Sequence, residues 1–176
     1  IGIMKIKSKK IRDLIFINNK SFKDKRGYFK ELMKEKDLKK KFPFLVMSFS
    51  KKNVIRGLHL QIKKPQDKII SVLKGKILDV VVDLRKNSKT FGKHFKIFLS
   101  EKKAKYLFIP KGFAHGFLGL EKENIVLYSC SNLRHIKGER SIKWNDKELN
   151  IKWGVKKPVL SKRDKLALSL QEFLKN

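Results

Sequence analysis

A series of short apolar segments separated by turn signals fills the middle of the chain and constrains the fold more than any other feature. Ile69–Leu73 and Ile77–Leu84 flank a turn centred on Gly75. Four further segments follow at short intervals, at residues 94–100, 106–109, 116–118 and 125–129. Apolar runs of this length between glycine and polar residues are typical of β-strands. The pattern predicts a mainly β protein built as a sandwich or a barrel.

Helical patterns lie nearer the two ends. The charged segment Phe29–Lys41 contains apolar residues at helical spacing, and so does Lys162–Leu174. The first 20 or so residues have room for an edge strand, and the apolar run Leu14–Ile17 suits one. A chain of 176 residues without a long linker or a repeat predicts one domain, residues 1–176.

Composition excludes several classes of protein. A hydrophobic content of 41% with 13 Phe argues against disorder. No apolar run approaches the ~20 residues of a membrane span, and Ile1–Lys7 is too short and too charged for a signal peptide. The single cysteine, Cys130, rules out an internal disulfide. We therefore expect a cytoplasmic protein without a membrane partner.

The net charge of +29 raises the possibility of nucleic-acid binding. The alternative is that lysine simply fills solvent-exposed positions. The basic residues are scattered in pairs and triplets along the whole chain and gather on no single helix or tail. We therefore predict no nucleic-acid partner, although the positive field would steer an anionic substrate to its site.

Two histidines and a tyrosine lie on or beside strand-like segments, and each can move a proton. They are His59 in the segment Arg56–Gln61, His115 in Pro110–His115, and Tyr128. His59 and Tyr128 also have a purely structural alternative, as core side chains whose polar atoms have hydrogen-bond partners. If one barrel cavity collects all three, the protein is a proton-transfer enzyme.

A carboxylate interrupts the apolar alternation of Ile77–Leu84. Asp79, Val81 and Asp83 share one face of this strand, and the leucines and other valines share the opposite face. A buried carboxylate is costly unless it is paired. Asp79 therefore either faces solvent or faces a polar cavity and holds a partner such as a histidine.

An ordered set of motifs extends from about Phe22 to about Asp164. The motifs are Asp24–Glu31, Asn53–Gln61, Leu78–Arg85, Ser88–Gly92, Ile109–Phe117, Leu127–Tyr128, Ile142–Asp146, Leu149–Trp153 and Leu160–Asp164. With these motifs in this order, the chain resembles the dTDP-4-dehydrorhamnose 3,5-epimerase family. The resemblance implies a cupin-type jelly-roll barrel with a few short helices near the ends.

The resemblance also implies a reaction. The substrate class is a nucleotide-diphosphate 4-keto-6-deoxyhexose, whose C4 carbonyl acidifies the hydrogens at C3 and C5. A base removes a proton, an enolate forms, and an acid on the opposite face returns a proton. Such chemistry needs a positioned base, a positioned acid and a cation near the enolate oxygen.

Four residues match the family's catalytic positions. His59 matches the general base, Asp164 the carboxylate that orients it, Tyr128 the acid on the opposite face, and Lys68 the cation near the enolate oxygen. Asp164 has an alternative role, because Ser161–Asp164 is also the pattern of a capping box that opens a helix. Lys68 has one too, because a lysine in so basic a chain is usually solvated.

The resemblance implies a substrate-binding set as well. Its members are Arg26, Phe29, Glu31, Arg56, Gln61, His115 and Glu139. Arg26 and Arg56 match diphosphate contacts, and Asp79 is the expected partner of His115. Phe29 and Glu31 match residues that reach the nucleotide in a neighbouring subunit. The resemblance therefore implies a homodimer whose segment of about residues 1–45 is exchanged with, or packed on, the partner.

Cupin metal sites usually use a His-x-His pair, a nearby acid and a distant histidine. Here Gln61 stands in the place of the second histidine, and Pro65 and Gln66 occupy the neighbourhood of the acid. Only His59 and His115 are left, too few for a firm site. We therefore predict no metal and no cofactor; the alternative is a metal-dependent cupin in which His115 is a ligand.

Two segments depart from the family pattern. Phe44–Met47 replaces a polar pattern at positions that contact the nucleotide base, and Leu133-Arg134 replaces a pair of tyrosines. Both changes concern nucleotide recognition or the wall of the pocket. They leave open an epimerase that acts on one carbon only, or on another nucleotide.

Overall fold

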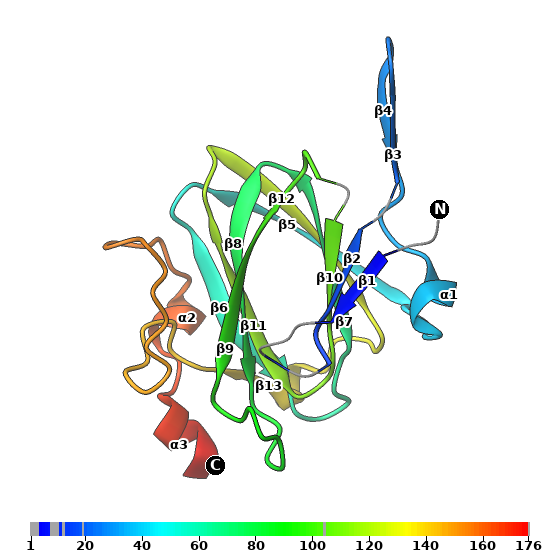
Figure 1. Ribbon diagram of the computed structural model, residues 1–176. Coiled ribbons are helices and arrows are strands. Elements are labelled where there is room, and N and C mark those ends of the chain that lie inside the picture. Colours follow the sequence, from blue (N-terminus) through cyan, green and yellow to red (C-terminus); the bar gives the residue numbers. More distant parts are fainter. Residues whose placement is uncertain (1–3, 8–10, 12, 19, 104, 176) are drawn as a thin grey trace.

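The computed structural model describes residues 4–7, 11, 13–18, 20–103 and 105–175, and its strands form two antiparallel sheets that face each other as a barrel (Figure 1). In spatial order, the six-stranded sheet contains β1 (Met4–Lys7), β2 (Ile15–Asn18), β10 (Lys105–Ile109), β7 (Lys68–Lys74), β12 (Glu123–Cys130) and β5 (Phe44–Lys51). The five-stranded sheet contains β13 (Glu139–Ser141), β6 (Ile55–Gln61), β11 (Phe113–Gly119), β8 (Lys76–Asp83) and β9 (His94–Ser100). The mainly β prediction is confirmed.

Strand β8 shows why two layers form. Its residues from Ile77 to Asp83 are buried on both faces. Ile77 and Val81 pack into the core between the two sheets. Leu78, Val80 and Val82 pack on the opposite side, in a second core. The alternation predicted from the sequence is therefore confirmed, and Asp79 lies on the inner side of the sheet with no exposed surface.

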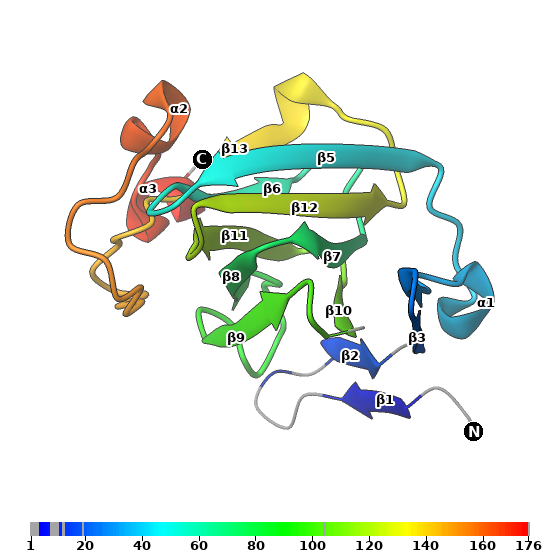
Figure 2. The ribbon, with the colours of Figure 1, turned by 90° about the horizontal axis from the view of Figure 1, so that it is seen from above.

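The second core lies where the C-terminal part of the chain covers the outside of the five-stranded sheet. Leu149, Ile151, Trp153 and Leu170 pack there against the outer residues of β6 and β8. Figure 2 places α2 (Lys162–Lys165) and α3 (Leu170–Lys175) on this side of the barrel, across from α1 (Glu35–Leu38). This packing fixes α2 beside β6, which matters for the site.

Both predicted helical segments are shorter than the sequence pattern indicated. Phe29 belongs to a strand, and the first helix ends at Lys39, whose φ is +53°. The C-terminal pattern splits into α2 and α3. Between them, Leu168 forms a parallel bridge with Ile142, and backbone hydrogen bonds to Ser141 and Lys143 replace helical ones. Tertiary pairing has overridden local propensity.

The first 20 or so residues contain an edge strand, as predicted, but the apolar run Leu14–Ile17 does not form it. The apolar run after Leu14 forms β2, which pairs with β10 on one side and β1 on the other. Residues 1–3, 8–10, 12 and 19 of this segment lie outside the described part of the chain. The edge strand of the six-stranded sheet is β1, which pairs with β2 and which the sequence pattern had not indicated.

The hairpin of β3 (Ser21–Asp24) and β4 (Gly27–Lys30) projects away from the barrel (Figure 1). Phe22, Tyr28 and Phe29 are exposed on it, and Phe29 exposes 68% of its surface. Aromatic side chains held so far from any core are unusual in an isolated chain. Within the described residues, no helix is both long and apolar enough to span a membrane.

Candidate active site

A cavity of about 340 Å³ opens between the two sheets. Its walls are formed by Phe44, Val46, Arg56, His59, Gln66, Lys68, His115, Tyr128, Cys130, Arg134, Glu139 and Arg163. His59 and His115 come from the five-stranded sheet, whereas Lys68 and Tyr128 come from the six-stranded sheet. The structure therefore collects the two histidines and the tyrosine in one cavity, with the tyrosine on the other wall.

A bulge in β6 turns Arg56 and His59 toward the same cavity. In a regular strand, residues three apart point to opposite faces. Here a step of two residues on β11, from His115 to Phe117, matches a step of three on β6, from His59 to Arg56. The extra residue restores a common face. Gly57 makes the bulge possible, because its φ is +137° and a Cβ there would lie 2.5 Å from Gly116 Cα.

His59 forms a close pair with Asp164 of α2. The two atoms Nε2 and Oδ1 are 2.5 Å apart, and Asp164 is buried. The hydroxyl of Ser161 donates to the other carboxylate oxygen at 2.8 Å and accepts from the Asp164 backbone N–H as the N-cap of α2. The capping interaction and the contact with histidine therefore coexist.

The surroundings keep Asp164 ionised. Burial alone would raise the pKa of Asp164, but the hydrogen bonds from His59 and Ser161 and the charge of Arg163 outweigh burial and lower it. An ionised carboxylate only accepts hydrogen bonds. Nε2 of His59 therefore donates the hydrogen bond, and in the neutral imidazole Nδ1 has the lone pair.

A second histidine–carboxylate pair is buried beside the first. His115 lies opposite His59 in the ladder, and its Nε2 is 2.8 Å from Oδ2 of Asp79. Both side chains are almost completely buried. Of the two alternatives for Asp79, the structure shows the one in which it faces inward and holds a histidine.

Tyr128 stands next to this second pair. Its ring meets the ring of His115 edge-on, with centroids 6.0 Å apart. Burial raises the pKa of Tyr128 above its ordinary value of 10.0. The phenol therefore keeps its proton at neutral pH and is available as a donor.

Lys68 supplies a cation on the same wall. It faces Cys130 directly in the β7–β12 ladder, so both side chains reach the cavity. Burial lowers the pKa of Lys68, and nearby Cys130 and Glu139 oppose that effect only partly. A half-buried ammonium of this kind is a poorly solvated charge that an anionic ligand can stabilise.

Arg134 and Arg163 also line the cavity, and the motif reasoning assigned neither of them a role. Both bind the carboxylate of Glu139, at 2.6 Å from Nε of Arg134 and 2.5 Å from Nη1 of Arg163. Glu139 thus lies in the cavity wall as expected. The two arginines lie in different segments and share no motif, so the sequence pattern did not indicate that they lie together.

Gln61 does not line the cavity in this single chain. It lies at the end of β6, where its amide nitrogen donates to the backbone carbonyls of Lys64 and Leu133. Its amide oxygen accepts from the backbone N–H of His135. These contacts use both N–H donors of the amide and one acceptor site of its oxygen, so Gln61 holds a loop in place.

Three other expected binding residues lie away from the cavity in this single chain. Arg26 and Phe29 are exposed on the projecting hairpin, where Arg26 pairs with Asp24 at 2.6 Å. Glu31 follows the hairpin and pairs with Lys34 at 2.7 Å. None of the three lines the cavity that contains His59.

The donor set of the cavity is poor in metal ligands. Each of its two histidines bonds through Nε2 to a carboxylate. Among the residues that the structure describes, no group of three or more His, Cys, Asp or Glu side chains is arranged to hold a metal ion.

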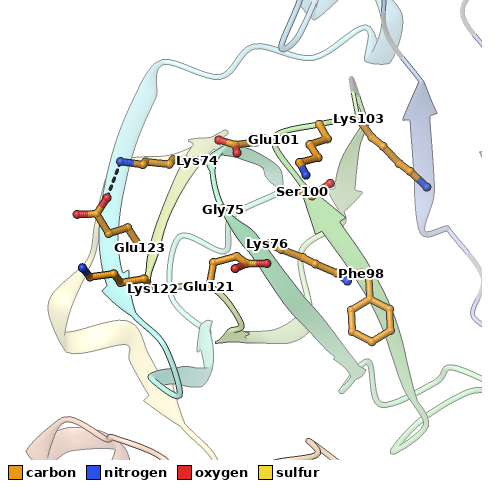
Figure 3. Close-up of a pocket in the computed structure, with 11 residues that line it drawn as sticks. Lys74, Gly75, Lys76, Phe98, Ser100, Glu101, Lys103, Glu121, Lys122 and Glu123 are labelled. Carbon is orange, nitrogen blue, oxygen red and sulfur yellow. Dashed lines mark hydrogen bonds and ion pairs between the residues drawn. The ribbon is translucent and has the colours of Figure 1, made fainter.

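A larger hollow of about 780 Å³ lies at the opposite ends of β7 and β12 (Figure 3). Its lining combines lysines and glutamates, with Lys74 paired to Glu123 at 2.5 Å and Lys76 over the ring of Phe98. It contains no histidine or tyrosine. Despite its size, it lacks the proton-transfer groups of the smaller cavity, which is therefore the candidate active site.

Comparisons with known proteins identify the family of the chain. Residues 8–172 match the family model of dTDP-4-dehydrorhamnose 3,5-epimerase. The enzyme of that name from Methanothermobacter thermautotrophicus is 40% identical over 90% of both chains. The crystal structure of dTDP-6-deoxy-D-glucose-3,5-epimerase from Legionella pneumophila, in complex with dTDP-4-keto-L-rhamnose, is 37% identical, with a TM-score of 0.91 over 97% of this chain and 94% of that one.

A more distant relative acts on one carbon. The 3'-monoepimerase from Streptomyces bikiniensis, solved in complex with dTDP-quinovose, is 27% identical, with a TM-score of 0.89 over 97% of this chain and 91% of that one. The fold of all these structures is the jelly-roll barrel that the motifs predicted. On this evidence the chain belongs to the dTDP-4-dehydrorhamnose 3,5-epimerase family.

Proposed function

We propose that this protein epimerises C3 and C5 of a dTDP-4-keto-6-deoxyhexose, converting dTDP-4-dehydro-6-deoxyglucose to dTDP-4-dehydrorhamnose. The observation that carries the proposal is the placement of a carboxylate-paired histidine and a protonated tyrosine on the two walls of one cavity. Inversion at carbon needs removal of a proton from one face and its return to the other. The cavity supplies a group for each face.

His59 is the base. Asp164 accepts the hydrogen bond from Nε2–H, so Nδ1 of the neutral imidazole has the lone pair that takes the proton from C3 or C5. The resulting imidazolium is stabilised by the ionised carboxylate. The electrons of the broken C–H bond form a C=C bond to C4, and the C4 oxygen becomes an enolate.

Lys68 stabilises the enolate oxygen. Its ammonium is poorly solvated before reaction, since burial lowers its pKa. Negative charge that develops on oxygen therefore interacts with it more strongly than it would in water. Buried His115, fixed by Asp79, lies beside His59 and offers a further contact to the sugar.

Tyr128 is the acid that completes inversion. Its phenol donates a proton to the carbon from the face opposite His59, and the enolate collapses back to the ketone. The raised pKa of Tyr128 keeps it protonated until that step. Water then returns a proton to the phenolate, and His59 releases its proton to solvent.

Epimerisation at a single carbon is the second candidate. It is favoured by the changed pocket wall, where Phe44, Val46 and Arg134 line the cavity, and by the similarity to a 3'-monoepimerase. The shape of this pocket wall limits how far the sugar ring can turn to present its second C–H bond to His59.

The test is incubation with dTDP-4-keto-6-deoxyglucose in deuterated water, with deuterium at C3 and C5 followed by NMR. Deuterium at both carbons with the rhamno configuration supports the proposal. Deuterium at one carbon selects the second candidate. No exchange with this substrate, or with its CDP and GDP analogues, contradicts both.

We further propose that residues 1–176 are one cupin-like domain that acts as a homodimer, with the segment of about residues 1–45 exchanged. The projecting hairpin supports this, because its Phe29 and Arg26 are exposed and do not line the cavity of their own chain. A cytoplasmic location is proposed as well, supported by the free, buried thiol of Cys130.

Complementation tests the exchange. Mixing an inactive His59→Ala protomer with an inactive Arg26→Ala/Phe29→Ala protomer should restore activity, because one cavity of the mixed dimer receives an intact hairpin and an intact base. A mixture that stays inactive, although mass measurement shows mixed dimers, contradicts the exchange.

A further inference from the structure

Burial has two opposing consequences for Tyr128 as an acid. It raises the pKa of the phenol, which keeps the proton in place until it is needed. It also makes the phenolate that remains after the proton transfer costly. A phenol without support for that charge would be a slow acid. The surroundings of Tyr128 should therefore contain groups that stabilise negative charge on its oxygen.

Burial raises the pKa of Tyr128, and two groups act against it. The hydroxyl of Ser48 on β5 lowers this pKa most strongly, and the charge of Arg56 on β6 lowers it less. Asp79 of β8 and Cys130 of β12 act in the other direction and raise the pKa. Ser48 has no part in the mechanism described above, so its effect on the acid needs an explanation.

The strand ladder places Ser48 beside the phenol. Tyr128 on β12 lies opposite Val46 on β5. The next pair on the same face of these two strands is Val126 with Ser48. Residues two apart share a face of a strand, so Ser48 lies on the face of Val46, which lines the cavity. Ser48 and Tyr128 are thus diagonal neighbours across the pair, a separation that an aromatic side chain bridges.

The hydroxyl of Ser48 has unused hydrogen-bonding capacity. Its oxygen is buried, and within the described part of the chain no group lies in hydrogen-bonding geometry to it. It is nevertheless close enough to the phenol of Tyr128 to favour the phenolate form. A buried hydroxyl without a partner lowers stability and is uncommon in native proteins. The hydroxyl of Ser48 is therefore available to a partner that forms during the reaction.

Strand β5 also anchors the cation that acts on Tyr128. Nε of Arg56 donates to the hydroxyl of Ser50 at 2.9 Å, and Nη2 donates to the backbone carbonyl of Phe49 at 2.8 Å. These bonds hold the guanidinium next to Ser48 in sequence. Residues 48–50 of β5 therefore hold in place both groups that favour the phenolate.

We propose that Ser48 is a positioning residue for the acid, and that its hydroxyl donates a hydrogen bond to the phenolate oxygen of Tyr128 as the proton leaves for carbon. The O–H bond of the tyrosine breaks and a C–H bond forms on the sugar, while Ser48 keeps its own proton. A hydrogen bond made only to the charged form stabilises the transition state more than the ground state. The inference rests on the proposed function, in which Tyr128 is the acid.

Two rival roles for Ser48 give different results on substitution. A serine that only packs between β5 and β12 would change the free energy of unfolding and leave the acidity of the phenol unchanged. A serine that binds the sugar directly would change the KM and also leave the phenol of the free protein unchanged. The acidity of Tyr128 therefore separates the proposed role from both rivals.

Titration of the phenol tests the proposal without any substrate. Difluorotyrosine at position 128 ionises at a lower pH than tyrosine, so fluorine NMR can follow its titration in the folded protein. Ser48→Ala should lower the acid dissociation constant of this phenol by about ten- to hundredfold, the loss of a hydrogen bond to a charged group. Ser48→Thr, which keeps the hydroxyl, should restore the wild-type constant.

The matched control is Ser129→Ala. It removes a hydroxyl from the residue next to Tyr128, on the opposite face of β12, where Ser129 is buried outside the cavity. The dissociation constant should stay at its wild-type value. An unchanged constant in Ser48→Ala, or an equal fall in both variants, would overturn the proposal.

Turnover in deuterated water gives a second, independent readout. Ser48→Ala should lower the ratio of epimerised product to deuterium entry, and it should have no further effect on that ratio in a Tyr128→Phe background, because it acts through the phenol. An additional loss in that background would overturn the proposal. The titration needs no substrate, so a wild type that catalyses no deuterium exchange would contradict the proposed function alone.

Discussion

Nε2 of His59 lies 2.5 Å from Oδ1 of Asp164, and the contact joins strand β6 to helix α2 across 105 residues of sequence. It depends on the C-terminal segment packing against the outside of the five-stranded sheet. The second core of the protein therefore sets the orientation of the proposed base, and stability and activity are coupled at this contact.

Asp164→Asn should lower kcat by about 10²- to 10⁴-fold, the range of positioned acid–base catalysis. The amide removes the negative charge that stabilises imidazolium and no longer selects the proton on Nε2. Ser161→Ala is the comparison, because it removes the hydroxyl that bonds to Asp164 and caps α2 but keeps the carboxylate. Its expected effects are a stability loss of about 1 kcal/mol and a much smaller fall in kcat. Equal kcat values for the two variants would contradict the role of Asp164.

Tyr128→Phe should separate proton removal from inversion. Without the phenol, His59 still abstracts a proton and can return one from solvent to the same face. Deuterium should therefore enter the recovered substrate faster than epimerised product forms. Tyr106→Phe, which alters a tyrosine of a separate core, should leave the ratio unchanged. An unaltered ratio of exchange to product in Tyr128→Phe would rule out the assigned acid.

Lys68→Met should make the protein less active but more stable at neutral pH. Loss of the cation at the enolate oxygen should cost about 10²-fold in kcat. Burial lowers the pKa of Lys68 in the folded protein below the 10.5 of the unfolded chain. The unfolded chain therefore binds more protons between these two values, and wild-type stability rises with pH through that window.

The stability advantage of Lys68→Met is thus fully present below the folded-state pKa and disappears as pH approaches 10.5. Urea unfolding at neutral pH and again near pH 10 measures it. Exposed Lys102, outside this cavity, provides the control substitution Lys102→Met, for which no such change is expected. An advantage that grows with pH would contradict the account.

Gly57→Ala should destabilise the protein by about 2–4 kcal/mol, because the energy of the strained backbone and the energy of the steric clash are added together. The added methyl group would meet the backbone of Gly116 at 2.5 Å, at a φ of +137°. Gly27→Ala is matched in backbone geometry, with a φ of +131°, but has no atom within 4 Å of its Cβ. This substitution should lower the free energy of unfolding by about 1 kcal/mol, because only the backbone conformation is strained. Equal free energies of unfolding would show that the close approach at the bulge has no energetic weight.

Periodicity was enough to predict the central strands β7 to β12, because strands such as β8 alternate cleanly between two cores, but it did not indicate β1 or β4. It was not enough for the helices. Residues between α2 and α3 have a helical pattern, yet the backbone of Leu168 pairs with Ile142, a partner that no local pattern reveals.

The candidate site, too, was predicted only in part from the sequence. Motif matching identified His59, Asp164 and Tyr128, but the bulge that brings Arg56 to their cavity appears only in the ladder between β6 and β11. The backbone contacts of Gln61 were not indicated by the motif, because its partners lie on loops that fold back onto it. Such contacts are set by tertiary packing, which single-sequence patterns do not encode.

The most direct test of the central claim is deuterium entry at C3 and C5 of dTDP-4-keto-6-deoxyglucose, compared between the wild type and His59→Ala. His94→Ala, which alters a histidine of β9 outside the cavity, is the control. The account predicts exchange at both carbons in the wild type and the control, and at neither carbon in His59→Ala, because one base serves both. Exchange at wild-type rate in His59→Ala would contradict it.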